Sequence, residues 1–232
     1  MMRFQIFKKA LIDSLGVFAA YVPLGMAYGY LFDQVTHVGW LAPFYSLFIF
    51  AGAIQFLALS FIGIEGATLS LVLGAAALGM RNAFYGIPLL SRFKGSKFFT
   101  SYLAFGLVDA TFAILSVQKP LPEKEDKWYI LYLTILIHAY WVLGTVAGVF
   151  AGKLISLPPG IEFSLTALFV VMLVDKIKST KDFRPLWIIA LSVLAASFMS
   201  HTHLFLNACC ISFFLCLFLP KKEIAAKEEA VS

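Results

Sequence analysis

Apolar runs long enough to cross a membrane follow one another along almost the entire chain. They cover residues 11–31, 40–61, 67–90, 98–117, 129–151, 161–174, 185–199 and 204–219. A helix needs about 20 apolar residues to span the hydrocarbon core, and runs of roughly 10 to 14 are more often broken or re-entrant pieces. The sequence therefore predicts an all-α fold, a polytopic integral membrane helical bundle. We expect about 6–8 membrane segments, with one or two of them broken or re-entrant.

The composition leaves room for a single membrane domain. Hydrophobic residues make up 61% of the chain and charged residues 13%, whereas soluble domains average roughly 45–50% and 25%. We expect the domain to cover residues 1–220 and a short polar tail to cover residues 221–232. The apolar run after Lys9 is long for a secretory signal, so it is interpreted as a retained first helix. Basic residues end the apolar runs, which indicates contact with lipid headgroups rather than nucleic acid.

The distribution of basic residues predicts an irregular topology. The positive charges of residues 3–9 place the N-terminus inside, because lysine and arginine favour the cytoplasmic side. If each of the first three apolar runs crossed the membrane, the charges of residues 92–97 would lie outside. This conflict disappears if one of those three runs enters and leaves on the same side. A second conflict, at residues 176–184, disappears if the run 161–174 does the same.

Helix-breaking residues indicate where such irregularity would lie. The candidates are residues 23–25, 79–81, 86–88 and 158–160, each of which combines proline or glycine with its neighbours. Non-helical backbone survives at membrane depth only inside protein or beside a wet cavity. Transporters build binding sites from such broken helices. Simple proline kinks between packed helices are the alternative interpretation.

Glycines recur at helical spacing in two of the runs. Gly25 and Gly29 form one pair, and Gly144, Gly148 and Gly152 form a longer stripe. Small residues four apart allow two helices to approach closely. We expect both faces to pack against helices, either inside the chain or on a partner protein.

Two isolated opposite charges, Arg81 and Asp109, lie within neighbouring apolar runs. A charge at the centre of a membrane helix costs roughly 2.5–3.5 kcal/mol on insertion scales, so it usually faces a partner, a cavity or a substrate. Asp109 is a candidate proton carrier, and Arg81 is the partner that would set its pKa. The alternative is a structural ion bridge that only joins two helices.

Other polar residues are weaker candidates. Gln55 lies beside small residues that include Gly52, which suits contact with a polar ligand; an interhelical hydrogen bond of about 1 kcal/mol is the alternative. Neither the histidines nor the three cysteines have metal-site spacing, so no metal and no cofactor is expected. Motifs of hydrolases and ATPases are absent from the sequence, and we therefore expect a transport protein rather than an enzyme.

Several blocks together resemble the azaleucine-resistance C (AzlC) family of branched-chain amino acid permeases. These blocks are Val22-Pro23-Leu24-Gly25, Phe50-Ala51-Gly52-Ala53-Ile54-Gln55-Phe56, Met80-Arg81 before Tyr85-Gly86, Asp109, and residues 141–148 and 163–169. The resemblance implies a multi-pass protein of the bacterial cytoplasmic membrane. It also implies a secondary exporter of neutral amino acids that works with a small membrane subunit of the AzlD type.

On this resemblance a substrate pathway can be assigned. Arg81, or a broken-helix N-terminus near Gly25 or Gly52, would receive the substrate carboxylate. Asp109 would face the ammonium group or carry the coupling proton, and Gln55 would orient the ligand. Pro23 and Asn82 complete the predicted pathway; family members often have histidine at the position of Asn82. The alternatives are a non-transporting subunit or scaffold, and a transporter of another small neutral solute.

Overall fold

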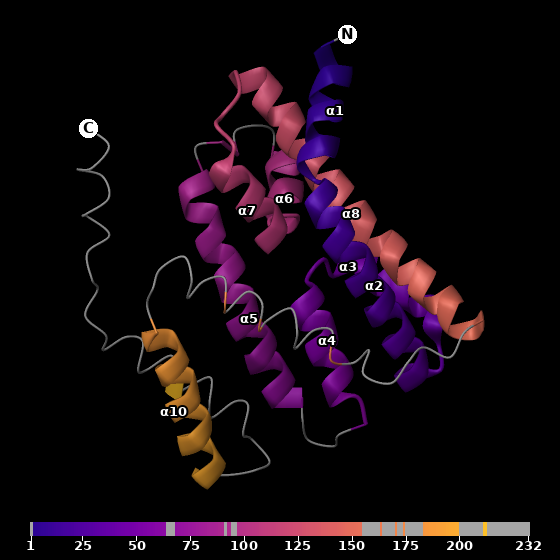
Figure 1. Ribbon diagram of the computed structural model, residues 1–232, viewed down its shortest axis with the longest axis vertical. Coiled ribbons are helices and arrows are strands. Elements are labelled where there is room, and N and C mark those ends of the chain that lie inside the picture. The colour runs from indigo at the N-terminus through magenta and orange to yellow at the C-terminus, as the bar shows by residue number, and fades with distance from the viewer. Residues whose placement is uncertain are drawn as a thin grey trace. The chain divides into compact units, whose positions relative to one another are not determined.

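The computed structural model describes residues 2–63, 68–90, 92–93, 97–154, 163, 170, 174, 183–199 and 211–212 (Figure 1). The chain divides into two compact units, Met1–Leu173 and Val174–Ser232. Every regular element among the described residues is a helix, so the all-α prediction is confirmed for this part of the chain. The second unit contributes one long described helix, α10 (Arg184–Met199), which is predominantly apolar.

Among the described residues, two or three helical segments have membrane-spanning character. Leu15–Thr36 and Glu123–Leu154 are long and apolar enough to cross a membrane, and the bent pair Phe99–Phe105 and Asp109–Val117 would add a third if it counted as one span. The predicted runs 161–174 and 204–219 lie largely outside the described residues. The expected total of membrane segments therefore stays a prediction.

Three helices form the scaffold of the first unit: α1 (Met2–Asp13), α2 (Leu15–Thr36) and α8 (Glu123–Leu154). The helix α8 runs parallel to α1 and α2 (Figure 1), because residues further along α1 and α2 contact residues further along α8. Tyr129 donates a hydrogen bond to Asp13 at 2.7 Å, and further along Gly152 packs against the ring of Tyr30. We call the two ends of this scaffold the Arg92 end, where α8 begins, and the Asp33 end, where α2 finishes.

The glycine stripes join α2 to α8 within the chain. A Cβ atom added at Gly25 would lie 2.8 Å from the carbonyl oxygen of Trp141, and one at Gly144 would lie 2.6 Å from that of Val22. At Gly148 the added atom would collide with the backbone of Met26. Backbone therefore packs directly on backbone along this seam, so the stripes are already used inside the chain.

The second apolar run folds into a hairpin rather than a straight span. After the 3₁₀ turn Gly39–Leu41, the helix α3 (Ala42–Phe48) leaves the Asp33 end, where the Gly39 amide donates to Asp33 Oδ1 at 2.9 Å. The chain then breaks, and α4 (Gly52–Phe61) returns to the same end, since Phe56 contacts the ring of Tyr28. The charge pattern predicts a run of this kind among the first three, and the side of the membrane on which its ends lie stays a prediction.

A second hairpin enters from the opposite end. The helix α5 (Thr68–Leu89) is followed by α6 (Lys97–Phe105) and α7 (Asp109–Val117), and these last two helices are bent by 108°. Thr100 near the start of α6 donates to the carbonyl of Phe93 at 3.4 Å. Arg92 donates to the carbonyls of Leu115 and Gln118 at the end of α7, at 2.8 and 3.3 Å. Both ends of the hairpin therefore lie at the Arg92 end, although the sequence predicts a single run over 98–117.

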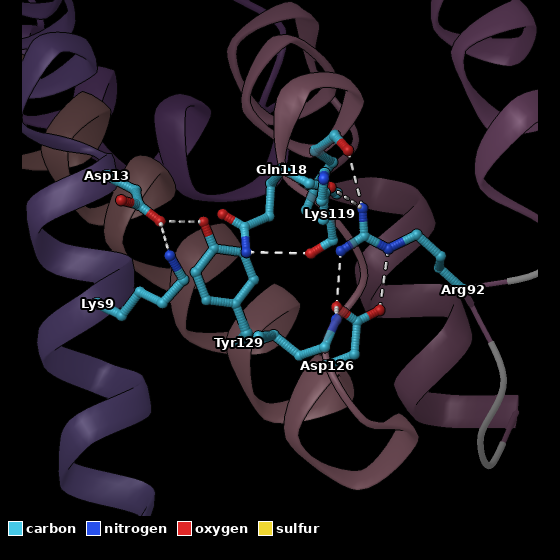
Figure 2. Close-up of polar contacts among 9 residues, drawn as sticks. Lys9, Asp13, Arg92, Gln118, Lys119, Asp126 and Tyr129 are labelled. Carbon is cyan, nitrogen blue, oxygen red and sulfur yellow. Dashed lines mark hydrogen bonds and ion pairs between the residues drawn. The ribbon is translucent and has the colours of Figure 1, made fainter. Parts of the chain in front are cut away.

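An ion pair fixes the base of this second hairpin (Figure 2). Arg92 grips the Asp126 carboxylate with two hydrogen bonds, Nε to Oδ2 at 2.9 Å and Nη2 to Oδ1 at 2.7 Å. The two side chains are only 9% and 7% exposed. The same guanidinium holds the last carbonyls of α7, so a single side chain joins the ends of α5 and α7 to the start of α8.

The predicted break positions differ from the observed ones. Pro23 lies within the uninterrupted α2, and residues 79–81 and 86–88 lie within α5, so breaks at those three sites are wrong predictions. Residues 158–160 lie outside the described part of the chain. The real breaks, at residues 49–51 and 106–108, each include or adjoin a glycine that packs on α8, Gly52 against Trp141 and Gly106 against Thr134.

Candidate functional site

A cavity lies where the two helix breaks meet. Its walls come from α2, the α3–α4 break and the start of α4, α5, the α6–α7 break with the first residue of α7, and α8. The lining residues are Tyr21, Leu24, Phe50, Ala51, Gly52, Ala53, Ile54, Phe56, Leu78, Asn82, Val108, Asp109 and Trp141. The cavity volume is about 40 Å³, and one buried water needs roughly 10–15 Å³. There is room for about three waters, or for a carboxylate or an ammonium group, but not for a branched-chain amino acid with its side chain.

Two helices have their N-termini at this cavity. α4 starts at Gly52 and α7 starts at Asp109, and neither Ala51 nor Val108 before them caps its helix with a side chain. The first N–H groups of a helix lack intrahelical acceptors and carry the positive end of the helix dipole. Residues 52–54 are all cavity residues. The α4 side of the cavity therefore supplies hydrogen-bond donors suited to an anionic group.

Hydrogen-bond acceptors lie on the other walls. Asp109 is half-buried, and its Oδ1 accepts a hydrogen bond from the Tyr21 hydroxyl at 2.8 Å. Asn82, on α5, has a buried Oδ1 atom that has no hydrogen-bond partner among the described residues. A buried acceptor left unpaired costs about 1–3 kcal/mol. These acceptors suit a cationic group or a donor that occupies the cavity.

Arg81 and Asp109 are not joined by the described contacts. The backbone of Arg81 belongs to α5, but its side chain lies outside the described part of the structure. The proposed pairing of these two charges stays a prediction. Among the described residues, the hydrogen-bond partner of Asp109 is Tyr21.

Gln55 lies behind the cavity rather than on its wall. It is 3% exposed, accepts a hydrogen bond from Trp141 Nε1 at 2.7 Å, and donates to Ser46 Oγ at 3.4 Å. Ser46 in turn pairs with the Thr145 hydroxyl at 2.8 Å. Gln55 thus links α4, α3 and α8, and it contacts a cavity residue through Trp141.

Pro23 and Gly25 are not brought to the cavity. Pro23 is exposed on α2, and Gly25 is buried in the seam against α8. Their neighbours Tyr21 and Leu24 line the cavity instead. Because Gly25 lies inside a continuous helix, the predicted helix N-terminus near it is wrong, whereas a helix does begin at Gly52.

Tyr21, Trp141 and Val108 are cavity residues that the site prediction missed. One sequence signal could have located the second break: aspartate is typical of helix starts, and Asp109 follows Gly106 by three residues. Tyr21 and Trp141 carry no comparable signal, since aromatic residues abound in the chain. Among the described residues, no group of three or more histidine, cysteine, aspartate or glutamate side chains could hold a metal ion.

Comparison with known proteins identifies relatives over most of the chain. A membrane protein of Helicobacter pylori is 30% identical over 221 residues, which cover 95% of this chain and 97% of the relative. The branched-chain amino acid transport protein AzlC of Bacillus subtilis is 30% identical over 81% of this chain and 74% of the relative. The inner membrane protein YgaZ of Escherichia coli is 30% identical over 69% of each chain.

No solved structure matches the chain. Residues 16–155 match the family described as AzlC protein, and this segment runs from the second residue of α2 to the end of α8, with both hairpins and every cavity residue. The resemblance noted from the sequence blocks is confirmed: this chain belongs to the AzlC protein family.

Proposed function

We propose that this chain is the transporting subunit of a secondary exporter for branched-chain or related neutral amino acids in the bacterial cytoplasmic membrane. The name of the Bacillus subtilis relative supports amino acid transport. We further propose that the chain works with a small membrane subunit of the AzlD type. No cofactor and no catalysis are part of this proposal.

The observation that carries the proposal is the two-sided polarity of the cavity. The first turn of α4, residues 52–54, lines one part of the cavity, while Asp109 and Asn82 line another. A zwitterion of zero net charge matches both parts at once. A free anion or a free cation would leave one of them unsatisfied.

The substrate would bind with its carboxylate at the α4 N-terminus and its ammonium group at Asp109 and Asn82. Charge-assisted hydrogen bonds to backbone N–H groups and to a carboxylate are among the strongest available in a protein. Tyr21 would release Asp109 or share it with the ammonium group. Because the cavity holds only a polar head in this conformation, the hairpins must separate to admit the side chain.

The hairpins suggest how the site would be reached from both sides. One hairpin, α3–α4, enters from the Asp33 end, and the other, α6–α7, enters from the Arg92 end. Lys119, Lys124 and Lys127 also gather at the Arg92 end, which the positive-inside rule assigns to the cytoplasm. In this arrangement α2, α5 and α8 would cross the membrane, and movement of one hairpin at a time would expose the site alternately.

Leucine efflux from loaded cells or proteoliposomes that contain the chain and its small partner tests the proposal. The Asp109→Asn variant should lose at least about tenfold in efflux, since it removes the charge that faces the ammonium group. Glu123→Gln removes a carboxylate from an exposed ion pair and is the matched control. Wild-type efflux from Asp109→Asn would refute the assigned site, and absence of any amino acid efflux from the wild-type complex would refute the function.

A scaffold without transport activity is the alternative. That function would use the glycine stripes to bind a partner, but the described stripes are occupied by the α2–α8 seam. Reconstitution with and without the small subunit separates the two functions, because a scaffold would give no efflux in either case.

A further inference from the structure

Trp141 forms a wall of the cavity that is held by its surroundings. It lies on α8, is 4% exposed, and places its ring against the first turn of α4. A Cβ atom added at Gly52 would be 2.7 Å from the ring atom Cη2 of Trp141. Glycine at position 52 therefore allows the indole to cover the start of α4, where the cavity lies.

A buried hydrogen bond fixes the orientation of this indole. Trp141 Nε1 donates to Gln55 Oε1 at 2.7 Å, and Gln55 is itself held by Ser46. The ring of Tyr21 meets the indole edge-on with 5.6 Å between centroids. Rotation of the indole would leave a buried N–H and a buried amide oxygen unpaired, so the wall stays where it is.

The backbone under Trp141 is equally constrained. Its carbonyl lies in the glycine seam, where a Cβ at Gly25 would approach it to 2.8 Å. The remaining walls include the aliphatic side chains Leu24, Ile54 and Leu78, which can change rotamer to fit a ligand. Trp141 is therefore the large cavity side chain that is fixed by both a hydrogen bond and its backbone packing.

We propose that Trp141 sets the upper size limit for the substrate side chain, and that Gln55 is the positioning residue that holds the indole in place. The inference rests on the proposed function, since it assigns the specificity of the same cavity. The substrate side chain enters only when the hairpins separate, and Trp141, whose backbone is held in the α2–α8 seam, then limits the space beside the polar head, so long or aromatic side chains are excluded by steric overlap. Removal of the wall should extend the range of substrates toward larger neutral amino acids.

The test measures efflux of alanine, valine, leucine, methionine and phenylalanine for the wild type and for Trp141→Leu, Trp141→Phe and Gln55→Leu. Trp141→Leu should raise the ratio of phenylalanine to leucine kcat/KM by roughly tenfold or more, the usual scale for pocket-size discrimination. Trp141→Phe, which keeps an aromatic ring, should give a smaller shift in the same direction. Gln55→Leu, which removes the acceptor of the Trp141 indole, should shift the ratio of phenylalanine to leucine KM in the same direction as Trp141→Leu and by a smaller factor.

Trp128→Phe is the matched control, because Trp128 also lies on α8 but contacts Arg3 and Tyr132 rather than the cavity. It should leave the substrate ratios unchanged. If Trp141→Leu and Trp141→Phe export leucine but keep the wild-type ratios, the wall does not set the size limit and this inference is wrong. If the wild type exports no amino acid, the proposed function itself fails, which is a distinguishable result.

Discussion

The ion pair between Arg92 and Asp126 should make a large contribution to the stability of the first unit. Its side chains are 9% and 7% exposed, and two hydrogen bonds of 2.9 and 2.7 Å join them. Removing one partner of a buried pair typically costs about 3–5 kcal/mol, because the other charge stays buried without compensation. Arg92→Met also frees the carbonyls of Leu115 and Gln118, so its cost should reach the top of this range.

The two single variants should differ. After Asp126→Leu, the Arg92 guanidinium keeps two carbonyl acceptors, those of Leu115 and Gln118. After Arg92→Met, the donor that the Asp126 carboxylate keeps among the described residues is the Leu121 amide at 3.2 Å. Arg92→Met should therefore destabilise more. The double variant replaces both charges by apolar side chains, so it should cost less than the sum of the two by about 2–3 kcal/mol.

Equilibrium unfolding in mixed detergent micelles, followed by tryptophan fluorescence, measures these free energies as a double-mutant cycle. The exposed pair of Glu123 and Lys127, four residues apart on α8, is the internal comparison and should couple by no more than about 0.5 kcal/mol. A coupling energy for Arg92 and Asp126 as small as that of the exposed pair would refute the reasoning. It would mean that water screens the ion pair at the base of the hairpin.

Three further predictions concern the seam, the topology and the cavity. Gly148→Ala should lower the yield of monodisperse protein in size-exclusion chromatography, since the added methyl group collides with the α2 backbone. Gly79→Ala is the control and should be tolerated, because its added methyl group meets no atom within 4 Å. Cysteines at Val38 and Lys119 should be labelled from opposite sides of the membrane by an impermeant thiol reagent; labelling from one side would contradict the parallel α2–α8 arrangement. Asn82→Leu should raise the KM for efflux and leave the free energy of unfolding within about 1 kcal/mol of the wild type, because the Asn82 Oδ1 atom has no hydrogen-bond partner among the described residues.

Much of the architecture was predictable because membrane helices have a strong local signal. The helical fold class and the position of α8 follow from the lengths of the apolar runs. The charges of residues 92–97 separately predicted that one run enters and leaves the membrane on the same side. Family membership was predictable from motif blocks around Gly52, Arg81 and Asp109. These features depend on residues that are close in sequence.

The helix breaks and the cavity walls were harder to predict because tertiary packing decides them. Proline and glycine at residues 23–25 suggested a break, yet α2 stays helical there because its backbone is packed against α8. The actual breaks occur where Gly52 and Gly106 fit under the α8 side chains Trp141 and Thr134. Only the fold shows that these pairs meet.

The division between a tightly packed seam and two hairpins indicates which parts would move during transport. Helices α2 and α8 pack backbone on backbone at their glycines, so sliding or separation would break many close contacts at once. The hairpins instead approach the cavity through helix ends and side chains, including Asp109 and the N-terminus of α4 at Gly52. A zwitterion bound between those two groups would hold one hairpin against the other across the fixed surface of Trp141. Substrate binding would thus favour the closed arrangement of both hairpins, and its release would require only one of them to withdraw.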